Sequence, residues 1–337
     1  MVRPVLSLVT ATLAIAAVLS GCASGSSPAE ARPARLAVEA YVEPGGDATA
    51  RVTDAAHRST TIGIDGVTIA EDGASLNPVP SGVSALARRA STGGATPELL
   101  VSNYSDVLGD FSPEIGTALL GSAAHRKRVA TDLAALAATQ HTSGVQIDLE
   151  SLREDDRAGL VAFAAEVRTA VHDRLGKRAP VSMAVMASTD AAGYRDTGYD
   201  LRALTANVDR FVLMTYDEHG PWSDPGTIGS LPWTKRVIAA AEGQGLPASR
   251  IDLGIAGYGY VWGGHGDAQL TPTAAQKAAG AAARWSAPSG EWWAKLADGR
   301  ELHWSDARSY RERVALARTL GLHGVALWSL NLMPLPA

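Results

Sequence analysis

The stretch TSGVQIDLESL, residues 142–152, alternates polar and apolar side chains through its centre. Gln146, Asp148 and Glu150 occupy every second position, with apolar residues between them. Because successive side chains of a β-strand point to opposite faces, these polar side chains share one face. Long helical patterns flank the strand, which predicts a buried strand in an α/β fold. Carboxylates on a buried strand are expected to have a chemical role.

Similar apolar runs alternate with helical patterns along the rest of the chain. The predicted strands are residues 36–42, 61–69, 98–104, 144–150, 180–187, 209–217, 251–259 and 324–332. The segments between them place apolar residues at three- and four-residue intervals, as in 125–140, 154–175, 233–243 and 306–321. Eight strand-helix units in roughly 300 residues predict a (β/α)8 TIM barrel rather than an open doubly wound sheet, for which the sequence has no glycine-rich phosphate loop. Residues 257–305 are too long for a loop and rich in tryptophan, so we expect a small α+β insertion between strands seven and eight.

The first residues follow the plan of a secretory signal. Arg3 precedes an apolar run over residues 5–19, which is shorter than the roughly 20 apolar residues of a transmembrane helix. LSGC at 19–22 resembles the lipobox of bacterial lipoproteins, in which the cysteine becomes the lipid-bearing N-terminus. Cys22 is the only cysteine, so we expect lipid attachment there after removal of residues 1–21. The alternative is a plain signal peptide with an incidental cysteine.

The expected domain plan has two further parts. Residues 22–36, rich in Ser, Ala, Pro and charge, are predicted to form a disordered tether, and residues 37–337 the barrel. With one cysteine the chain cannot form an internal disulfide, so its stability must come from a core. A net charge of -5 without a basic stripe argues against nucleic acid as a partner. We expect an extracytoplasmic, membrane-anchored monomer.

In TIM barrels the active site lies at the C-terminal ends of the strands. The polar and aromatic residues at these ends are Asp148, Glu150, Tyr216, Asp217, Tyr258 and Trp328. Inward-facing carboxylates in a medium of low dielectric constant raise one another's pKa, so one of them can stay protonated near neutral pH and act as a general acid. The pattern therefore predicts proton transfer at the barrel mouth.

Several motifs resemble one family. SGVQIDLE, residues 143–150, resembles the DGxDxDxE signature of glycoside hydrolase family 18, the chitinase-like enzymes. MTYDEHGPWSDPGTIGSLPW, residues 214–233, resembles the strand-six motif in the form found among bacterial spore-cortex and cell-wall N-acetylglucosaminidases. GYGYVW, LADGRELHWSDARSY and GVALWSL follow in the family's order. The strand-three SxGG-type motif is not obvious, and NYS at 103–105 stands near its place.

This resemblance implies hydrolysis of β-1,4-linked N-acetylglucosamine glycans by a substrate-assisted retaining mechanism, an exception to the usual two-carboxylate scheme. Glu150 would be the general acid and Asp148 the support for the substrate's acetamido group. Tyr216 and Asp217 would hold that group, and Trp328 would form the apolar floor. The expected substrate-binding residues are Gln146, Met214, Tyr258, Trp262, Trp328 and Asn103. No cofactor is implied.

Two positions depart from the signature, because Ser143 and Gln146 stand where the family has aspartates. A neutral residue at 146 removes a like charge beside Asp148, so we expect Asp148 to ionise more readily. Ser143 begins the strand, far from the mouth, where we expect it to pack. Glu150 and Asp148 are both present, which favours catalysis over the alternative, a catalytically weak or inactive lectin-like protein on the same barrel.

Other interpretations stay open at this point. Peptidoglycan is preferred to chitin as substrate, and an endo-acting enzyme on glycoprotein glycans is a third possibility. The tryptophans at 292, 293 and 304 either stack on sugars or form a core, and His219 either caps a loop or binds ligand. Asp65, within the predicted strand 61–69, is interpreted as a turn or loop residue, with lining of the cleft as the alternative. The eight histidines lack HExxH or similar spacing and no G-x-S-x-G elbow is present, which argues against a metal site and against Ser-His-Asp chemistry.

Overall fold

The computed structural model describes residues 36–263 and 268–337. The predicted signal peptide, Cys22 and all but the last residue of the predicted tether lie outside this part of the chain. Within it, no helix combines the length and the apolar character that crossing a membrane requires.

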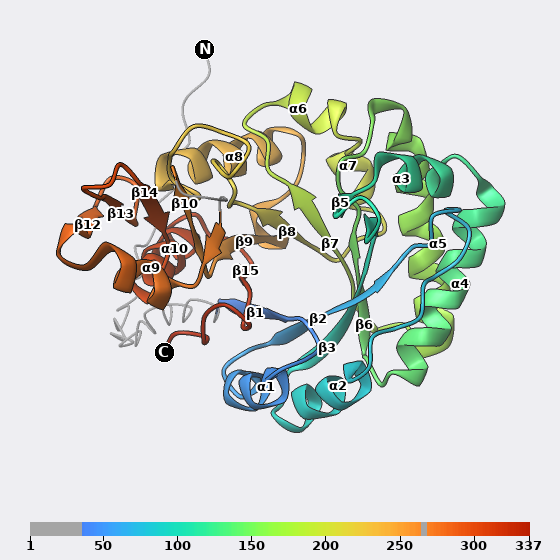
Figure 1. Cartoon of the computed structure of the whole chain (residues 1–337). Helices are drawn as coiled ribbons and strands as arrows, with labels where there is room; N and C mark the ends of the chain where they lie inside the picture. Colours follow the sequence, from blue (N-terminus) through green and yellow to red (C-terminus); the bar gives the residue numbers. More distant parts are fainter. Residues whose placement is uncertain (1–35, 264–267) are drawn as a thin grey trace, which may run out of the picture. The chain divides into compact units, whose positions relative to one another are not determined.

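The eight predicted strands close into a parallel barrel with helices on its outside (Figure 1). They are β1 (Ala37–Val42), β2 (Thr61–Thr68), β3 (Thr96–Ser102), β6 (Gly144–Asp148), β7 (Val181–Met186), β8 (Arg210–Met214), β9 (Ile251–Ala256) and β15 (Gly324–Trp328). Around the barrel the order is β1-β15-β9-β8-β7-β6-β3-β2, so β1 pairs with both the last strand and β2. The predicted TIM barrel is confirmed.

The helices bury the outward-facing branched residues of the strands. They are α1 (Ala48–Ala56), α2 (Val83–Thr92), α3 (Pro113–Leu120), α4 (Ala123–Thr139), α5 (Arg157–Leu175), α6 (Ala191–Asp196), α7 (Leu201–Leu204), α8 (Leu231–Gly243) and α10 (Ala307–Thr319), with 3-10 turns at Glu154–Asp156 and Ala248–Arg250. Local signals fix several of their starts. Ser112, Ser122 and Ser230 each accept a hydrogen bond from the backbone N–H three residues on, and Asp306 caps α10 in the same way.

The segment between β9 and α10 forms the expected α+β insertion (Figure 1). It contains β10 (Gly259–Trp262), β11 (Ala268–Leu270), α9 (Pro272–Ala279), a 3-10 turn (Gly280–Ala282), β12 (Arg284–Ser286), β13 (Glu291–Lys295) and β14 (Glu301–Trp304). Its strands make one sheet in the order β11-β10-β14-β13-β12. Trp304 is fully buried and stacks on Trp292 with ring centroids 6.1 Å apart, whereas Trp293 is 38% exposed. Two of the three tryptophans are therefore core.

One local feature was not foreseen. A hairpin of β4 (Tyr104–Ser105) and β5 (Asp110–Phe111) follows β3 and reaches the barrel mouth. Asp65 lies inside β2, within the predicted strand 61–69, and the turn or loop interpretation corresponds there to an irregular pairing with β3.

A buried cluster of charges lies inside the barrel below the mouth. The Arg210 guanidinium on β8 donates to Glu39 at 2.5 Å, Glu98 at 2.7 Å and Asp252 at 3.0 Å, carboxylates from three other strands. All four side chains are at most 9% exposed. Burial raises the pKa of Glu39 to about 7, and the charge of Arg210 opposes this rise. One guanidinium thus joins β1, β3, β8 and β9.

Replacing Arg210 with methionine is expected to lower the free energy of unfolding by about 3–5 kcal/mol, because it leaves buried carboxylates without their cation. The loss should shrink as the pH falls and Glu39, whose pKa is raised, takes up a proton. Urea unfolding followed by circular dichroism measures it. Arg128→Met is the control: Arg128 is 68% exposed and 3.9 Å from Asp132, so its loss should change stability by less than about 1 kcal/mol. Equal effects of the two substitutions would contradict a structural role for the buried cluster.

Candidate active site

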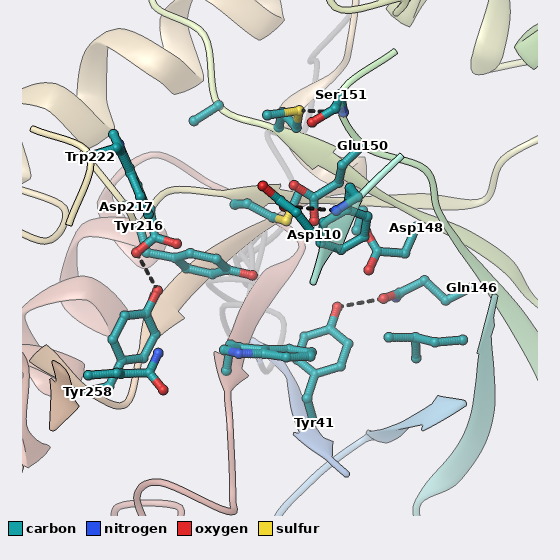
Figure 2. A pocket seen from close by; sticks show the side chains of 18 of the residues that line it. Tyr41, Asp110, Gln146, Asp148, Glu150, Ser151, Tyr216, Asp217, Trp222 and Tyr258 are labelled. Atoms are coloured by element: carbon teal, nitrogen blue, oxygen red, sulfur yellow. Dashed lines mark hydrogen bonds between the residues drawn. The ribbon is translucent and has the colours of Figure 1, made fainter. Parts of the chain in front are cut away.

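A cavity of about 520 Å³ opens at the C-terminal ends of the barrel strands. The predicted site residues that line it are Glu150, Asp148, Tyr216, Asp217, Gln146, Met214, Tyr258 and Trp328. Figure 2 shows the carboxyl groups of Glu150 and Asp148 and the hydroxyl of Tyr216 directed at one shared space. Side chains from strands far apart in the sequence therefore meet at one place.

Glu150 follows the end of β6 and is partly buried. Burial, followed by the charges of Asp148, Asp217 and Asp110, raises its pKa well above the ordinary value of 4.5. A carboxyl group in such surroundings keeps its proton at higher pH than an exposed one, as a general acid must. The electrostatics of the cavity therefore suit Glu150 to donate a proton.

Asn103 is one of the residues expected to bind substrate. Its side chain is fully buried and is not part of the cavity wall. The amide oxygen accepts from the backbone N–H of Glu150 at 2.9 Å, and the amide nitrogen donates to the carbonyls of Glu150 at 2.9 Å and Ser112 at 2.8 Å. With its polar atoms already used, Asn103 clamps the backbone that carries Glu150.

Asp148 is 7% exposed, and its Oδ1 has no hydrogen-bond partner in the part of the chain that the structure describes. Burial, followed by repulsion from Asp65, raises the pKa of Asp148 to about 7. The effect of Gln146, easier ionisation of Asp148 than beside an aspartate, stays a prediction, because burial and Asp65 are the causes that raise this pKa. Loss of one like charge does not compensate for burial, and a second carboxylate acts on Asp148 from β2.

Asp217 is held by two tyrosines of the segment that enters the insertion. Tyr258 donates to Asp217 Oδ1 at 2.7 Å and Tyr260 at 3.1 Å. Burial raises the pKa of Asp217, and these two hydrogen bonds oppose the rise. The Asp217 backbone has a φ of 59°, a conformation that costs energy for a residue other than glycine and that often occurs at functional sites.

The Tyr216 hydroxyl remains a donor. Burial, followed by the charges of Asp148, Glu150 and Asp217, raises its pKa well above 10. Its ring packs edge-on against Tyr258 with centroids 6.3 Å apart. Tyr216 can therefore donate a hydrogen bond into the cavity throughout the neutral range.

The floor of the cavity is aromatic and apolar. Trp328 packs on Tyr41 with centroids 5.3 Å apart, above the buried side chains of Leu100, Val212 and Ala326. Gln146 borders the cavity but is fully buried: Tyr41 donates to its Oε1 at 2.7 Å, and its Nε2 donates to Ser182 at 2.9 Å. Both polar atoms of its amide are hydrogen-bonded to other side chains, so its predicted contact with substrate is limited to the edge of the cavity.

Trp262 was also expected to bind substrate, and it lies outside the cavity wall. It is 5% exposed, and its indole N–H donates to the carbonyls of Gly220 and Ser223, each at 3.1 Å. Trp262 thus anchors the loop after β8. That loop presents Trp222, which is 68% exposed, lines the cavity and packs edge-on against Tyr260.

Two further contacts hold the same loop. Glu291 on β13 accepts from the backbone N–H groups of Ile228 and Gly229, both at 2.9 Å. His219 contacts the carbonyl of Thr227 at 3.0 Å through Nδ1, which supports the loop-capping interpretation. The insertion and the loop thus position the outer wall of the cavity together.

Sequence reasoning missed several lining residues: Tyr41, Asp110, Trp222, Trp233 and Tyr260. Tyr41 could have been found from its predicted strand and Tyr260 from the GYGYVW motif, and Trp222 and Trp233 lie in the strand-six motif. Asp110 had no local signal, because its hairpin is defined by a pairing two residues long. Among the lining residues that the structure describes, the charged ones are all acidic.

Glu150, whose pKa is raised, lies beside the buried carboxyl group of Asp148 and above an aromatic floor at the mouth of a (β/α)8 barrel, an arrangement suited to acid-base chemistry on a sugar. The chain belongs to glycosyl hydrolases family 18, whose model matches residues 84–332.

Relatives support the same assignment. The chain is 28% identical over 250 residues to the putative sporulation-specific glycosylase YdhD of Bacillus subtilis, covering 70% of this chain and 58% of the relative. It is 23% identical over 270 residues to the cortical fragment-lytic enzyme of Bacillus anthracis, covering 76% and 61%. It thus spans less than two thirds of each of these proteins. A chitinase structure from Chromobacterium violaceum superposes with a TM-score of 0.77 at 26% identity, covering 88% of this chain and 95% of that one.

Proposed function

We propose that this glycosidase hydrolyses β-1,4-linked glycans that contain N-acetylglucosamine, with peptidoglycan preferred to chitin, by a substrate-assisted retaining mechanism. The observation that carries the proposal is the placement of Glu150, whose pKa is raised well above its ordinary value, in one cavity with Asp148, Tyr216 and the Trp328 floor.

In the first step Glu150 protonates the glycosidic oxygen while the carbonyl oxygen of the sugar's own 2-acetamido group attacks the anomeric carbon. The bond to the leaving sugar breaks and an oxazolinium ion forms. Ionised Asp148 accepts a hydrogen bond from the acetamido N–H and stabilises the positive charge, and Tyr216 donates to the acetamido oxygen. Water then attacks the anomeric carbon, the Glu150 carboxylate takes its proton, and both the acid and the acetamido group are regenerated.

The surroundings of the other carboxylates support a nucleophile that comes from the substrate. Asp217 Oδ1 is already occupied by two tyrosine hydroxyls, and Asp148 is almost fully buried. The acidic lining of the cavity suits a sugar without negative charge at the cleavage point, as an N-acetylglucosamine residue is.

Peptidoglycan is preferred because the strand-six motif resembles the form found in cell-wall enzymes, and because one relative is named a cortical fragment-lytic enzyme. The test is release of reducing ends from peptidoglycan and from chitin oligosaccharides, side by side. Faster release from peptidoglycan is expected. Faster release from chitin would reverse the order of substrates, and binding of both without hydrolysis would leave a lectin-like protein.

We also propose that the chain is anchored to the outer side of the cell membrane by lipid on Cys22, as the LSGC sequence at 19–22 suggests. Cys22→Ala should block processing or move the protein out of the membrane fraction, while the specific activity of the barrel is retained. Fractionation and immunoblotting of cells that express the two forms measure this. Detergent-dependent partitioning that is the same in both forms would argue against the anchor.

A further inference from the structure

An irregularity in β2 places an acidic side chain that the mechanism above does not use. The register of β2 with β3 runs from Ile64↔Leu99 to Val67↔Val101, so Asp65 and Gly66 together oppose Leu100. This is a β-bulge, a feature that is common beside active sites and changes the direction of a side chain. A Cβ on Gly66 would lie 2.2 Å from the Leu100 carbonyl oxygen, so the bulge requires glycine at this position.

The Asp65 side chain points into the barrel. Two residues earlier, a Cβ on Gly63 would lie 2.5 Å from Tyr41 Cδ1, so that position faces the interior. Ile62 and Ile64 pack in the outer core between strands and helices. By the alternation of a strand, Asp65 shares the inner face with Gly63.

The pairing of β3 with β6 places the bulge that carries Asp65 level with Gln146, two residues before Asp148. Leu100, which opposes the bulge, pairs with Gln146, and Ser102 pairs with Asp148. Gln146 is neutral and its amide is bound by other side chains. The carboxylate that acts on Asp148 therefore comes from β2, one strand beyond the immediate neighbour of β6.

The charges around this pair are consistent with that geometry. Burial, followed by Asp65, raises the pKa of Asp148 to about 7, and burial, followed by Glu43 at the end of β1, raises that of Asp65 to about 6. The charge of Asp148 in turn raises the pKa of four further groups that face it: Tyr41, Glu150, Tyr199 and Tyr216.

We infer that Asp65 is a positioning residue of the reaction, which from the β2 bulge acts on Asp148 and sets the lowest pH at which the enzyme cleaves its glycan. This inference rests on the proposed function, in which Asp148 must be ionised to stabilise the oxazolinium ion. A negative charge at 65 delays that ionisation as the pH rises. The acid limb of the pH–rate profile then reports Asp148, and the alkaline limb reports the proton on Glu150.

The test is the pH dependence of kcat/KM for Asp65→Asn. Removing the charge should let Asp148 ionise at lower pH, which moves the acid limb down by on the order of one pH unit and raises the rate about tenfold on that limb. The alkaline limb should stay at the same pH, because Asp65 is not among the charges that raise the pKa of Glu150. Asp65→Glu keeps the charge and should keep the wild-type profile.

Asp110→Asn is the matched control, because Asp110 raises the pKa of Glu150 and is not among the causes for Asp148. This substitution should shift the alkaline limb of the profile to lower pH and leave the acid limb at the same pH. An acid limb that is the same in wild type and Asp65→Asn would overturn the inference, as would an equal shift caused by Asp110→Asn.

A second measurement needs no activity. Titration of carboxyl carbons by 13C NMR should show the pKa of Asp148 lower in Asp65→Asn than in the wild type, and an unchanged value would overturn the inference. If the wild type cleaves no acetylated glycan while this shift is observed, the proposed function fails and the electrostatic coupling stands. If it cleaves normally and neither the shift nor the limb change occurs, only the role of Asp65 fails.

Discussion

Replacement of Glu150 with glutamine is expected to reduce kcat by roughly 10²- to 10⁴-fold, the typical contribution of general acid catalysis. The amide has nearly the same shape, so the two hydrogen bonds between the Asn103 side chain and the Glu150 backbone remain. It cannot give a proton to the leaving oxygen or take one from water. Because the surroundings already favour an uncharged side chain at this position, the variant should fold at least as stably as the wild type.

The measurement is kcat on the preferred glycan, with oligosaccharide binding followed separately by calorimetry. Glu242→Gln on α8 is the control, because it makes the same chemical change on an exposed side chain. It should leave kcat unchanged. Full activity of Glu150→Gln would show that another group supplies the proton and would remove the basis of the mechanism.

A fully de-N-acetylated glucosamine oligomer should bind but be cleaved at least about 10³-fold more slowly than its acetylated counterpart. The acetamido oxygen is held next to the anomeric carbon, and an intramolecular nucleophile has an effective molarity on the order of 10⁵ M or more. A sugar without that group has no nucleophile of its own. A thiazoline analogue of the oxazolinium ion should be a competitive inhibitor, since it resembles the bound intermediate.

Two substitutions test the same point from the protein side. Tyr216→Phe and Asp148→Asn should lower kcat more than they raise KM, because their hydrogen bonds are made chiefly as the oxazolinium forms. Reducing-end assays and mass spectrometry give the readouts. Equal cleavage of acetylated and de-N-acetylated oligomers, together with a covalent sugar adduct on a protein carboxylate, would show that the enzyme supplies the nucleophile itself.

The sequence alone was sufficient for the barrel and for the catalytic strand. Alternation within residues 144–150 places Gln146, Asp148 and Glu150 on one face, and the strand ends of a parallel barrel meet at one mouth. Alternation is local, since it depends only on the pleat of a single strand. It therefore predicts which side chains point inward without any knowledge of their neighbours.

Tertiary structure decided which of the inward-facing residues, and which residues of the family motifs, have polar atoms available to contact a substrate. Asn103 and Trp262 lie in the expected segments, yet their polar atoms are used by the backbone of Glu150 and by the loop after β8. A hydrogen bond between residues about 40 positions apart has no signature in either local sequence. Burial likewise depends on every element packed around a side chain.

The ionisation of Asp148 shows most clearly what the local sequence does not predict. From the sequence, Gln146 was the neighbour considered, and its neutral side chain predicted that Asp148 ionises more readily than beside an aspartate. In the folded chain Asp148 is buried, and the charge of Asp65, on β2 beyond the neighbouring strand β3, raises its pKa further. Sequence fixes the face on which a carboxylate lies, because that follows from the geometry of one strand. Its pKa depends on desolvation and on charges from other strands, which only the closed barrel brings together.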